Sequence, residues 1–123
     1  MRNVRKTEEQ KRASFCLAEI KSFKSKHKNN EETLKKFKTS ARSLPQCIVS
    51  DGLLPTLAFY KSKEEKKSVY ELLNKWLREK GIINNDALEE IAEADAQILR
   101  LATMEALAFG NWLKRLVEVE IEK

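Results

Sequence analysis

Residues 31–48, with the sequence EETLKKFKTSARSLPQCI, decide the fold of this chain. Apolar residues recur in this stretch at intervals of three and four, as Leu34, Phe37, Ala41, Leu44 and Ile48. This spacing places all of them on one side of an α-helix, so the stretch predicts an amphipathic helix that packs against other helices. Asn30 is a suitable N-cap, and Glu31 and Glu32 favour the positive end of the helix.

Pro45 lies inside this apolar stripe and has no backbone N–H to donate. Either the helix bends near Ser43 and Leu44, which is the interpretation we favour, or a new turn begins there with Pro45 in its first turn. Asp51 and Gly52 are expected to end the segment.

The same periodicity predicts five further helices. They run from about Thr7 to His27, from Pro55 to about Tyr60, from Lys63 to Lys80, from Asp86 to Ala94, and from Asp95 to Glu120. We expect the helix that begins at Pro55 to be central, because it is nearly all apolar. The last helix is expected to be roughly 39 Å long at 1.5 Å per residue and to bury Ile98, Leu101, Ala102, Ala108, Trp112, Leu116 and Val119.

Composition favours the same fold class. The 123 residues include only 3 Gly and 2 Pro, too few turn-formers for a many-stranded barrel or sandwich. We therefore expect one all-α domain over residues 1–123, a compact bundle of about six helices with a long C-terminal helix. No stretch approaches the roughly 20 uncharged apolar residues of a membrane span, and no signal peptide is apparent, so we expect a cytoplasmic protein without membrane contact.

The charged residues are unevenly distributed. The net charge of +5 divides into +8 in residues 1–50, +2 in residues 51–80 and −5 in residues 81–123. The basic half indicates a polyanionic partner, and the acidic half indicates either internal neutralisation or a basic protein neighbour. Charge alone does not separate this interpretation from a merely solvated surface.

The inventory of catalytic and metal-binding residues is thin. His27 is the single histidine and lies among lysines, which indicates a solvated helix end. Together with Cys16 and Cys47 it supplies fewer than the four ligands of a structural zinc site, and both cysteines are expected to be buried free thiols. Phosphate-binding glycine loops and nucleophile motifs are missing from the sequence. We therefore expect no enzyme activity, no metal and no cofactor.

The positive signal is a row of cations. Lys35, Lys38 and Arg42 repeat the spacing of the apolar stripe displaced by one residue, which predicts a cationic ridge about 100° away from it. Lys21, Lys24 and Lys28 repeat the pattern on the first helix. Such a ridge can follow a phosphate backbone without reading any base, although lysine-rich faces can also serve only to keep a helix solvated.

Aromatic side chains offer a weaker signal for base stacking. Trp76, Trp112 and Phe59 fall in phase with apolar helix faces, so we expect them in the core. Only the role of Tyr60 stays open.

The segments RSLP (42–45), DGLLPTLAFYKSK (51–63), TMEAL (103–107) and WLKR (112–115), taken in order, resemble the small subunit of the type III-B CRISPR RNA-silencing complex, the Cmr complex. The resemblance implies a small, all-helical, non-catalytic subunit present in more than one copy. It further implies that these copies stack along the guide RNA filament and help to line the channel for guide and target RNA, while cleavage belongs to other subunits.

The matching segments imply the RNA-backbone contacts Arg42, Lys61, Lys63, Lys114 and Arg115, with Arg100 as a further candidate. Lys35 and Lys38 join them on helix geometry alone. Lys114 could instead form an ion pair with Glu118, four residues later. The expected partners are the guide RNA/target RNA duplex, the other subunits of the CRISPR effector complex, and self-stacking copies. The alternative is a purely structural protein-interaction bundle that acts as a spacer without RNA contact.

Overall fold

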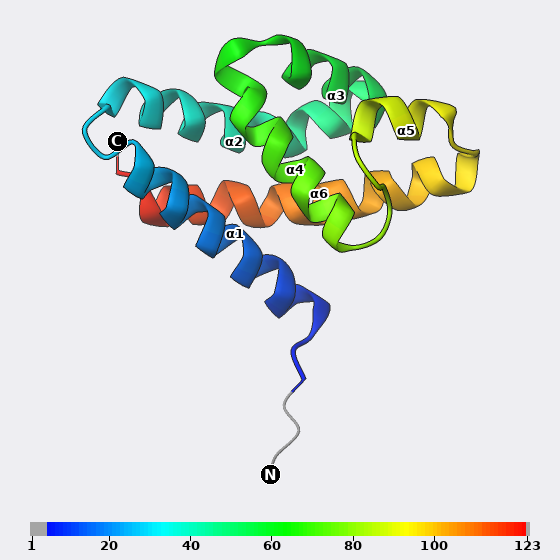
Figure 1. The fold of residues 1–123 in the computed structure, drawn as a ribbon, viewed down its shortest axis with the longest axis horizontal. Coiled ribbons are helices and arrows are strands. Elements are labelled where there is room, and N and C mark those ends of the chain that lie inside the picture. Colours follow the sequence, from blue (N-terminus) through cyan, green and yellow to red (C-terminus); the bar gives the residue numbers. More distant parts are fainter. Residues whose placement is uncertain (1–4, 123) are drawn as a thin grey trace.

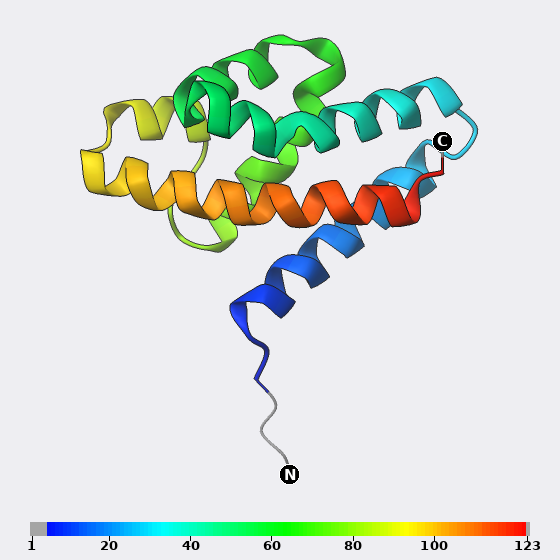
Figure 2. The same cartoon turned by 180° about the vertical axis from the view of Figure 1, so that it is seen from behind.

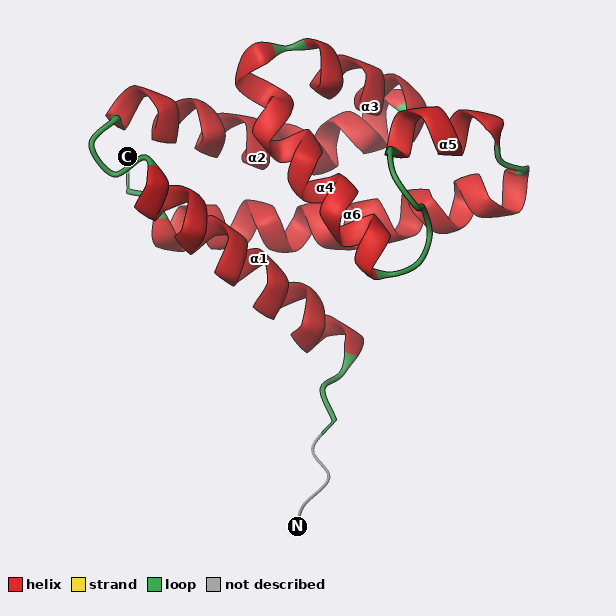
Figure 3. Cartoon of the chain, in the orientation of Figure 1, coloured by secondary structure: helices red, strands yellow, loops and turns green. Residues whose placement is uncertain are grey.

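The computed structural model describes residues 5–122, which form six α-helices and one short 3₁₀ turn (Figure 1). The elements are α1 (Glu8–Lys26), α2 (Glu31–Asp51), α3 (Leu53–Ser62), η1 (Glu64–Lys66), α4 (Lys67–Glu79), α5 (Ala87–Glu93) and α6 (Ala96–Glu120). Figure 3 shows only helices and loops over these residues. The predicted all-α fold, with six helices and a long C-terminal one, is confirmed. No helix of the described chain is both long and apolar enough to cross a membrane.

Helices α2 and α6 form the spine of the molecule. They lie side by side and run in opposite directions, as Figure 1 and Figure 2 both show. Helices α1 and α4 pack against α6 on the side that faces the viewer in Figure 1, and α3 packs on α2, α4 and α5. The opposite side, which faces the viewer in Figure 2, is therefore built mainly from α2 and α6.

The spine helices approach closely where α6 carries Gly110. A Cβ atom built there would lie 3.4 Å from Cδ2 of Leu44 and 3.5 Å from Cγ of Pro45, which is van der Waals contact, so a residue no larger than alanine fits between the two helices. Helix α2 continues through Pro45 to Asp51, which excludes the alternative that a new helix starts at Pro45. It ends at Gly52, whose φ of +91° favours glycine.

The predicted helix starts are confirmed at two side-chain caps. The Asn30 side chain accepts a hydrogen bond from the Thr33 amide, and the Asp86 side chain accepts one from the Glu89 amide. Two other boundaries differ from the prediction. Helix α3 begins at Leu53 rather than at Pro55, and the segment expected from Lys63 opens as η1 before α4 begins.

The buried side of α6 differs from the predicted one. Leu101 is 50% exposed and Val119 is 68% exposed, although both were expected in the core. Phe109, Leu113 and Val117 are buried in their place. Because the apolar residues of α6 cover an arc wider than the buried one, helical spacing alone fits more than one stripe, and packing against α1, α2 and α4 selects the buried one.

Of two neighbouring aromatic residues in α3, the one expected in the core is exposed and the one whose role was left open is buried. Phe59 is 41% exposed, so its prediction as a core residue is wrong, and the ammonium groups of Lys63 and Lys66 lie over its ring. Tyr60 is buried, and its hydroxyl donates to the Ser40 carbonyl at 2.7 Å. Burial raises the pKa of Tyr60 to about 12. A phenol with a buried acceptor is satisfied in the core, which removes the cost of burying its hydroxyl.

The remaining aromatic and thiol predictions hold in part. Trp76 is buried as expected, whereas Trp112 is only half-buried. Cys16 is a buried free thiol, and burial raises its pKa to about 12. Cys47 is also free but only half-buried. His27 caps the end of α1, and its ring centroid lies 4.3 Å from that of Phe23. His27 is therefore not fully solvated.

A buried polar cluster joins three helices. Arg12 of α1 donates from Nε and from a terminal nitrogen to the two carboxylate oxygens of Glu105 in α6, at 2.7 and 3.0 Å. Trp76 of α4 donates its indole N–H to the same carboxylate at 2.8 Å. Burial acts to raise the pKa of Glu105, but the hydrogen bonds from Arg12 and Trp76 outweigh it and the pKa is lowered. Glu105 thus stays charged inside the bundle.

Candidate nucleic-acid interface

Six of the eight predicted RNA contacts lie on the two spine helices. Helix α2 carries Lys35, Lys38 and Arg42, and α6 carries Arg100, Lys114 and Arg115. We call the outer side of these two helices the α2–α6 face, defined by these six residues, Glu118 and the exposed apolar residues Val49, Leu101 and Met104. In Figure 2 the two helices themselves lie towards the viewer. The fold therefore assembles two cationic rows that are about 60 residues or more apart in sequence.

Two contacts fix how the rows lie against each other. Nε of Arg42 lies 2.9 Å from a carboxylate oxygen of Glu118, and Nζ of Lys38 donates to the Ile121 carbonyl at 2.7 Å. Since Lys38 reaches Ile121 just past the end of α6 and the helices are antiparallel, the row on α6 begins beside Arg42 and continues the row on α2 along the face. Glu118, the alternative partner considered for Lys114, instead pairs with Arg42 across the helices.

Some cations on this face already bond to other groups of the protein, and others do not. Lys38 is half-buried and its ammonium stabilises the C-terminal end of α6, where a cation is favourable. The side chains of Arg42 and Glu118 are 53% and 47% exposed, so this pair is a weak surface ion pair. Lys35, Arg100, Lys114 and Arg115 are exposed or half-buried and form no ion pair within the described residues. These four can meet a phosphate without giving up a carboxylate.

Lys61 and Lys63, the other two predicted contacts, lie apart from this face at the end of α3. Nζ of Lys61 is bonded to Asp86 at 3.0 Å, and Tyr70 and Asn74 donate to the same carboxylate. Burial acts to raise the pKa of Asp86, but these hydrogen bonds lower it. Lys61 therefore already helps to hold the N-terminus of α5. Lys63 is exposed beside the Phe59 ring, and the structure does not bring it to the six residues on the spine.

The second predicted ridge lies only in part on α1, because Lys28 falls in the turn after the helix ends at Lys26. Lys21, Lys24 and Lys28 are all exposed. Lys24 and Lys28 border a surface hollow that is also lined by Glu31, Glu120 and Glu122, so acidic groups partly offset this ridge. The α2–α6 face is the better candidate for a polyanion.

An exposed apolar patch occupies the other half of the α2–α6 face. Val49 is 68% exposed near the C-terminal end of α2, and Leu101 and Met104 are 50% and 65% exposed in the first half of α6. Because the two helices are antiparallel, the C-terminal end of α2 lies beside the first half of α6. The face thus carries most of its cations towards one end and the three apolar residues Val49, Leu101 and Met104 towards the other, where Arg100 also lies.

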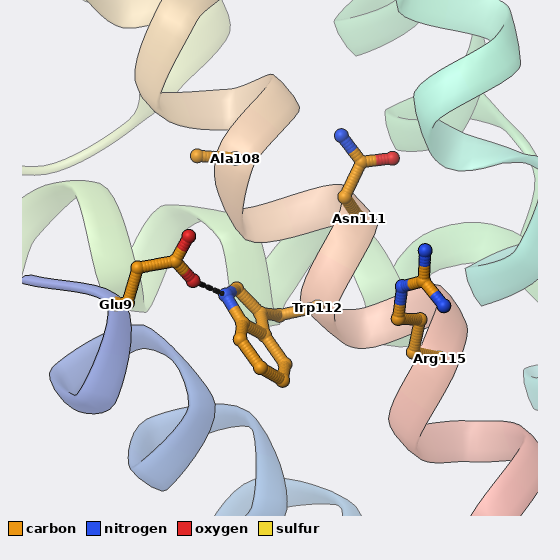
Figure 4. Close-up of a pocket in the computed structure, with 5 residues that line it drawn as sticks. All are labelled: Glu9, Ala108, Asn111, Trp112 and Arg115. Atoms are coloured by element: carbon orange, nitrogen blue, oxygen red, sulfur yellow. Dashed lines mark hydrogen bonds between the residues drawn. The ribbon is translucent and has the colours of Figure 1, made fainter.

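A surface pocket lies between α1 and α6 at the border of this face. It has a volume of about 330 Å³ and is lined by Glu9, Ala108, Asn111, Trp112 and Arg115 (Figure 4). The indole N–H of Trp112 donates to Oε1 of Glu9 at 2.5 Å. Figure 4 shows Glu9 and Trp112 on one side of the pocket and Asn111 and Arg115 on the other. Sequence reasoning missed this pocket, although Ala108, Trp112 and Arg115 share one helical stripe, because it assigned Trp112 to the core.

The described residues contain no group of three or more His, Cys, Asp or Glu side chains arranged to hold a metal ion. Two partly buried ion pairs, Arg12 with Glu105 and Lys61 with Asp86, hold helices together. Their charged groups are therefore already bonded to each other. What the α2–α6 face can do chemically is to attract a polyanion and to bury apolar surface against a neighbour.

Comparison with known proteins gives two findings. Residues 8–120 match the Cas_Cmr5 family of CRISPR-associated proteins. The structure is similar to the X-ray crystal structure of a CRISPR-associated Cmr5 family protein from Thermus thermophilus, with a TM-score of 0.72 and 25% sequence identity. That match covers 95% of this chain and 100% of the Thermus chain.

Proposed function

The chain belongs to the Cmr5 family of CRISPR-associated proteins, the small subunit of the type III-B Cmr complex, and from this premise we propose that its α2–α6 face contacts the backbone of the guide RNA/target RNA duplex. In this proposal the subunit is non-catalytic. It stacks with further copies and with other subunits along the guide RNA filament in antiviral defence, and it acts in the cytoplasm.

The observation that carries the proposal is the continuity of the cations on α2 with those on α6. Arg42 of α2 pairs with Glu118 of α6, which follows Lys114 by one helical turn, so Arg42 and Lys114 lie in neighbouring turns of the two helices. Lys35 lies two turns from Arg42 towards one end of the face, and Lys114 and Arg115 lie on the side of Arg42 towards the other end. Lysine and arginine side chains bind phosphates mainly through charge and through the counterions that the nucleic acid releases. Such binding is blind to base sequence, which suits a subunit that must accept any guide.

The division of the face into a basic and an apolar half supports two kinds of contact. The basic half suits RNA. The apolar half, with Val49, Leu101 and Met104, suits a protein neighbour, because exposed apolar surface of this kind is typical of protein interfaces. We assign it to the next copy or to another subunit of the complex.

The test compares two variants of the assembled complex that lose the same charge. The first carries Lys35→Gln, Arg42→Gln and Lys114→Gln on the α2–α6 face. The second carries Lys6→Gln, Lys26→Gln and Lys67→Gln, three exposed cations outside it. RNA affinity is measured against salt concentration. Three lost phosphate contacts should flatten the slope of log K against log salt by roughly 2 to 3 in the first variant and leave the second unchanged. Equal slopes in both variants would contradict the proposal.

The alternative function is a spacer that touches only protein. The exposed apolar patch on the same face favours it, since such a patch needs no RNA to explain it. Ultraviolet crosslinking of the particle with its guide and target bound separates the two functions. Crosslinks that map to α2 and to the second half of α6 support RNA contact, and their absence together with salt-insensitive assembly supports the spacer.

A further inference from the structure

The pocket between α1 and α6 has a chemistry that the phosphate-binding face does not use. We infer that it binds one unpaired nucleotide, with the base against the indole of Trp112, the hydrogen-bond donors of the base towards Glu9, and the phosphate at Arg115. Guanine is the base that it fits best. This inference rests on the proposed function, because it assumes that RNA runs along the neighbouring face, and it adds a base contact to a binding mode that otherwise reads no bases.

The aromatic wall of the pocket is fixed before any ligand arrives. Trp112 is half-buried, and its indole N–H is held by Oε1 of Glu9 at 2.5 Å. The volume of about 330 Å³ lies at the lower end of the range for small-molecule sites and accommodates a base and its sugar. An aromatic ring that is held in place is a suitable stacking platform, because little side-chain freedom is lost on binding.

The polar groups stand at opposite sides of this wall. Glu9 offers a carboxylate on the α1 side, and Arg115 offers an exposed guanidinium on the α6 side (Figure 4). Asn111 adds an exposed amide next to Arg115. A nucleotide has the same polarity, with N–H donors on the base and a negative phosphate at the other end. The pocket and the ligand therefore match in charge as well as in size.

Other occupants match less well. A lone phosphate would meet the carboxylate of Glu9, and an arginine or lysine side chain from a neighbouring protein would meet the guanidinium of Arg115. Among the four bases, guanine presents two adjacent donors, its N1–H and its amino group, to a carboxylate acceptor. Uracil presents a single ring N–H, and adenine and cytosine present only an amino group. Glu9 should thus prefer guanine.

The position of the pocket connects it to the RNA-binding face. Arg115 belongs both to the pocket and to the cationic row on α6, next to Lys114. A backbone that follows this row passes Arg115, so a single base turned out of the strand reaches Trp112 without a change in the path of the phosphates. Single-stranded or turned-out bases are the ones that proteins stack on aromatic side chains.

The experiment uses the full chain with its tryptophan indoles labelled with ¹⁵N. Guanosine, adenosine, cytidine and uridine 5′-monophosphates are titrated in turn, followed by guanosine without phosphate. The Trp112 indole resonance, assigned by its loss in Trp112→Phe, should shift most at low concentrations of guanosine monophosphate. The resonance of Trp76, whose indole N–H is buried against Glu105, should stay in place and serves as the internal control.

Two variants test the assigned roles. Glu9→Gln should weaken guanosine monophosphate binding roughly tenfold and remove the preference for guanine, since a hydrogen bond to a charged acceptor is worth about one order of magnitude. Its matched control, Glu71→Gln, removes an exposed carboxylate from α4 and should change nothing. Arg115→Gln should weaken binding of the monophosphate but leave binding of guanosine unchanged, because guanosine has no phosphate.

Three results would overturn the inference. The Trp112 indole resonance could fail to shift with any of the four monophosphates, or it could shift equally with all four. It could also shift with N-acetylarginine amide and not with nucleotides. The salt-slope experiment on the assembled complex is independent of this one. If the salt slope is unchanged but the pocket binds guanosine monophosphate, the proposed RNA contact of the α2–α6 face is wrong and the nucleotide site stands. If the slope flattens but the pocket binds no nucleotide, only the nucleotide site is wrong.

Discussion

Replacing Arg12 with methionine removes one partner of the buried ion pair that ties α1 to α6. The side chains of Arg12 and Glu105 are 17% and 9% exposed, and the substitution leaves the Glu105 carboxylate with the Trp76 indole N–H as its one remaining donor in the cluster. Breaking such a pair on one side costs about 3–5 kcal/mol, because a charge stays buried without its counterion. Since Glu105 keeps slight contact with solvent, we expect about 3 kcal/mol at pH 7.

The stability lost in Arg12→Met should be smaller at low pH than at neutral pH. In the wild-type chain the pKa of Glu105 is lowered from its ordinary value of 4.5, so its contribution to stability is present above that value and is lost as the pH falls through the lowered pKa. Burial acts to raise the pKa of Glu105, and the substitution removes the hydrogen bond from Arg12, the first of the contacts that lower it, so the pKa should be higher in the variant than in the wild-type chain. The carboxyl of the variant then takes up a proton as the pH falls, which relieves the penalty. The difference in stability between the two chains should therefore be smaller at pH 4 than at pH 7.

The assay is urea and thermal unfolding of the full chain at both pH values. A loss of about 3 kcal/mol corresponds to a Tm lower by about 10–15 °C for a domain of this size. Lys11→Met, on the same helix but with an exposed partner in Glu8, is the matched control and should change the Tm little. The reasoning is refuted if Arg12→Met costs no more than Lys11→Met at pH 7, or if its cost is the same at both pH values.

Three further predictions concern the loops and the thiols. Glu90 accepts hydrogen bonds from the Asn84, Asn85 and Asp86 amides, so Glu90→Gln should speed hydrogen exchange at residues 84–86, whereas Glu89→Gln should not. Gly52 has φ +91° and ψ 165°, a region that other residues adopt at a cost of about 1–3 kcal/mol, so Gly52→Ala should lower the free energy of unfolding by that amount in urea titrations. A thiol reagent at pH 8 should label Cys47 in the native chain and label Cys16 only after unfolding, because burial raises the pKa of Cys16 to about 12, and equal labelling of both would contradict the burial of Cys16.

The sequence predicts helices well where one stripe of apolar residues is matched by polar residues elsewhere. In α2, the predicted residues Phe37, Ala41, Leu44 and Ile48 are all buried. In α6 the same reasoning places Leu101 and Val119 inside, because the apolar residues cover a wide arc of that helix and more than one stripe has the right spacing. Which stripe is buried depends on contacts with α1, α2 and α4, and these are decided by residues far away in the chain.

The candidate site was predictable in its components but not in its arrangement. The cationic row of Lys35, Lys38 and Arg42 follows from helical spacing, and its partner row on α6 was identified through the resemblance to a family. The pairing of Arg42 with Glu118 and of Lys61 with Asp86 joins residues 76 and 25 positions apart, so local periodicity contains no sign of it. The pocket at Trp112 escaped prediction for the same reason, since Glu9 reaches it from the other end of the chain.

The close approach of Gly110 to Leu44 and Pro45 has a consequence for the α2–α6 face. A Cβ atom at this position would lie 3.4 Å from Cδ2 of Leu44 and 3.5 Å from Cγ of Pro45, which is ordinary van der Waals contact, so alanine fits without separating the two helices. A side chain longer than a methyl group has no such room and would push α2 away from α6. Under the proposed function, this uncharged interior position therefore sets how close together the cationic residues of the two helices can lie.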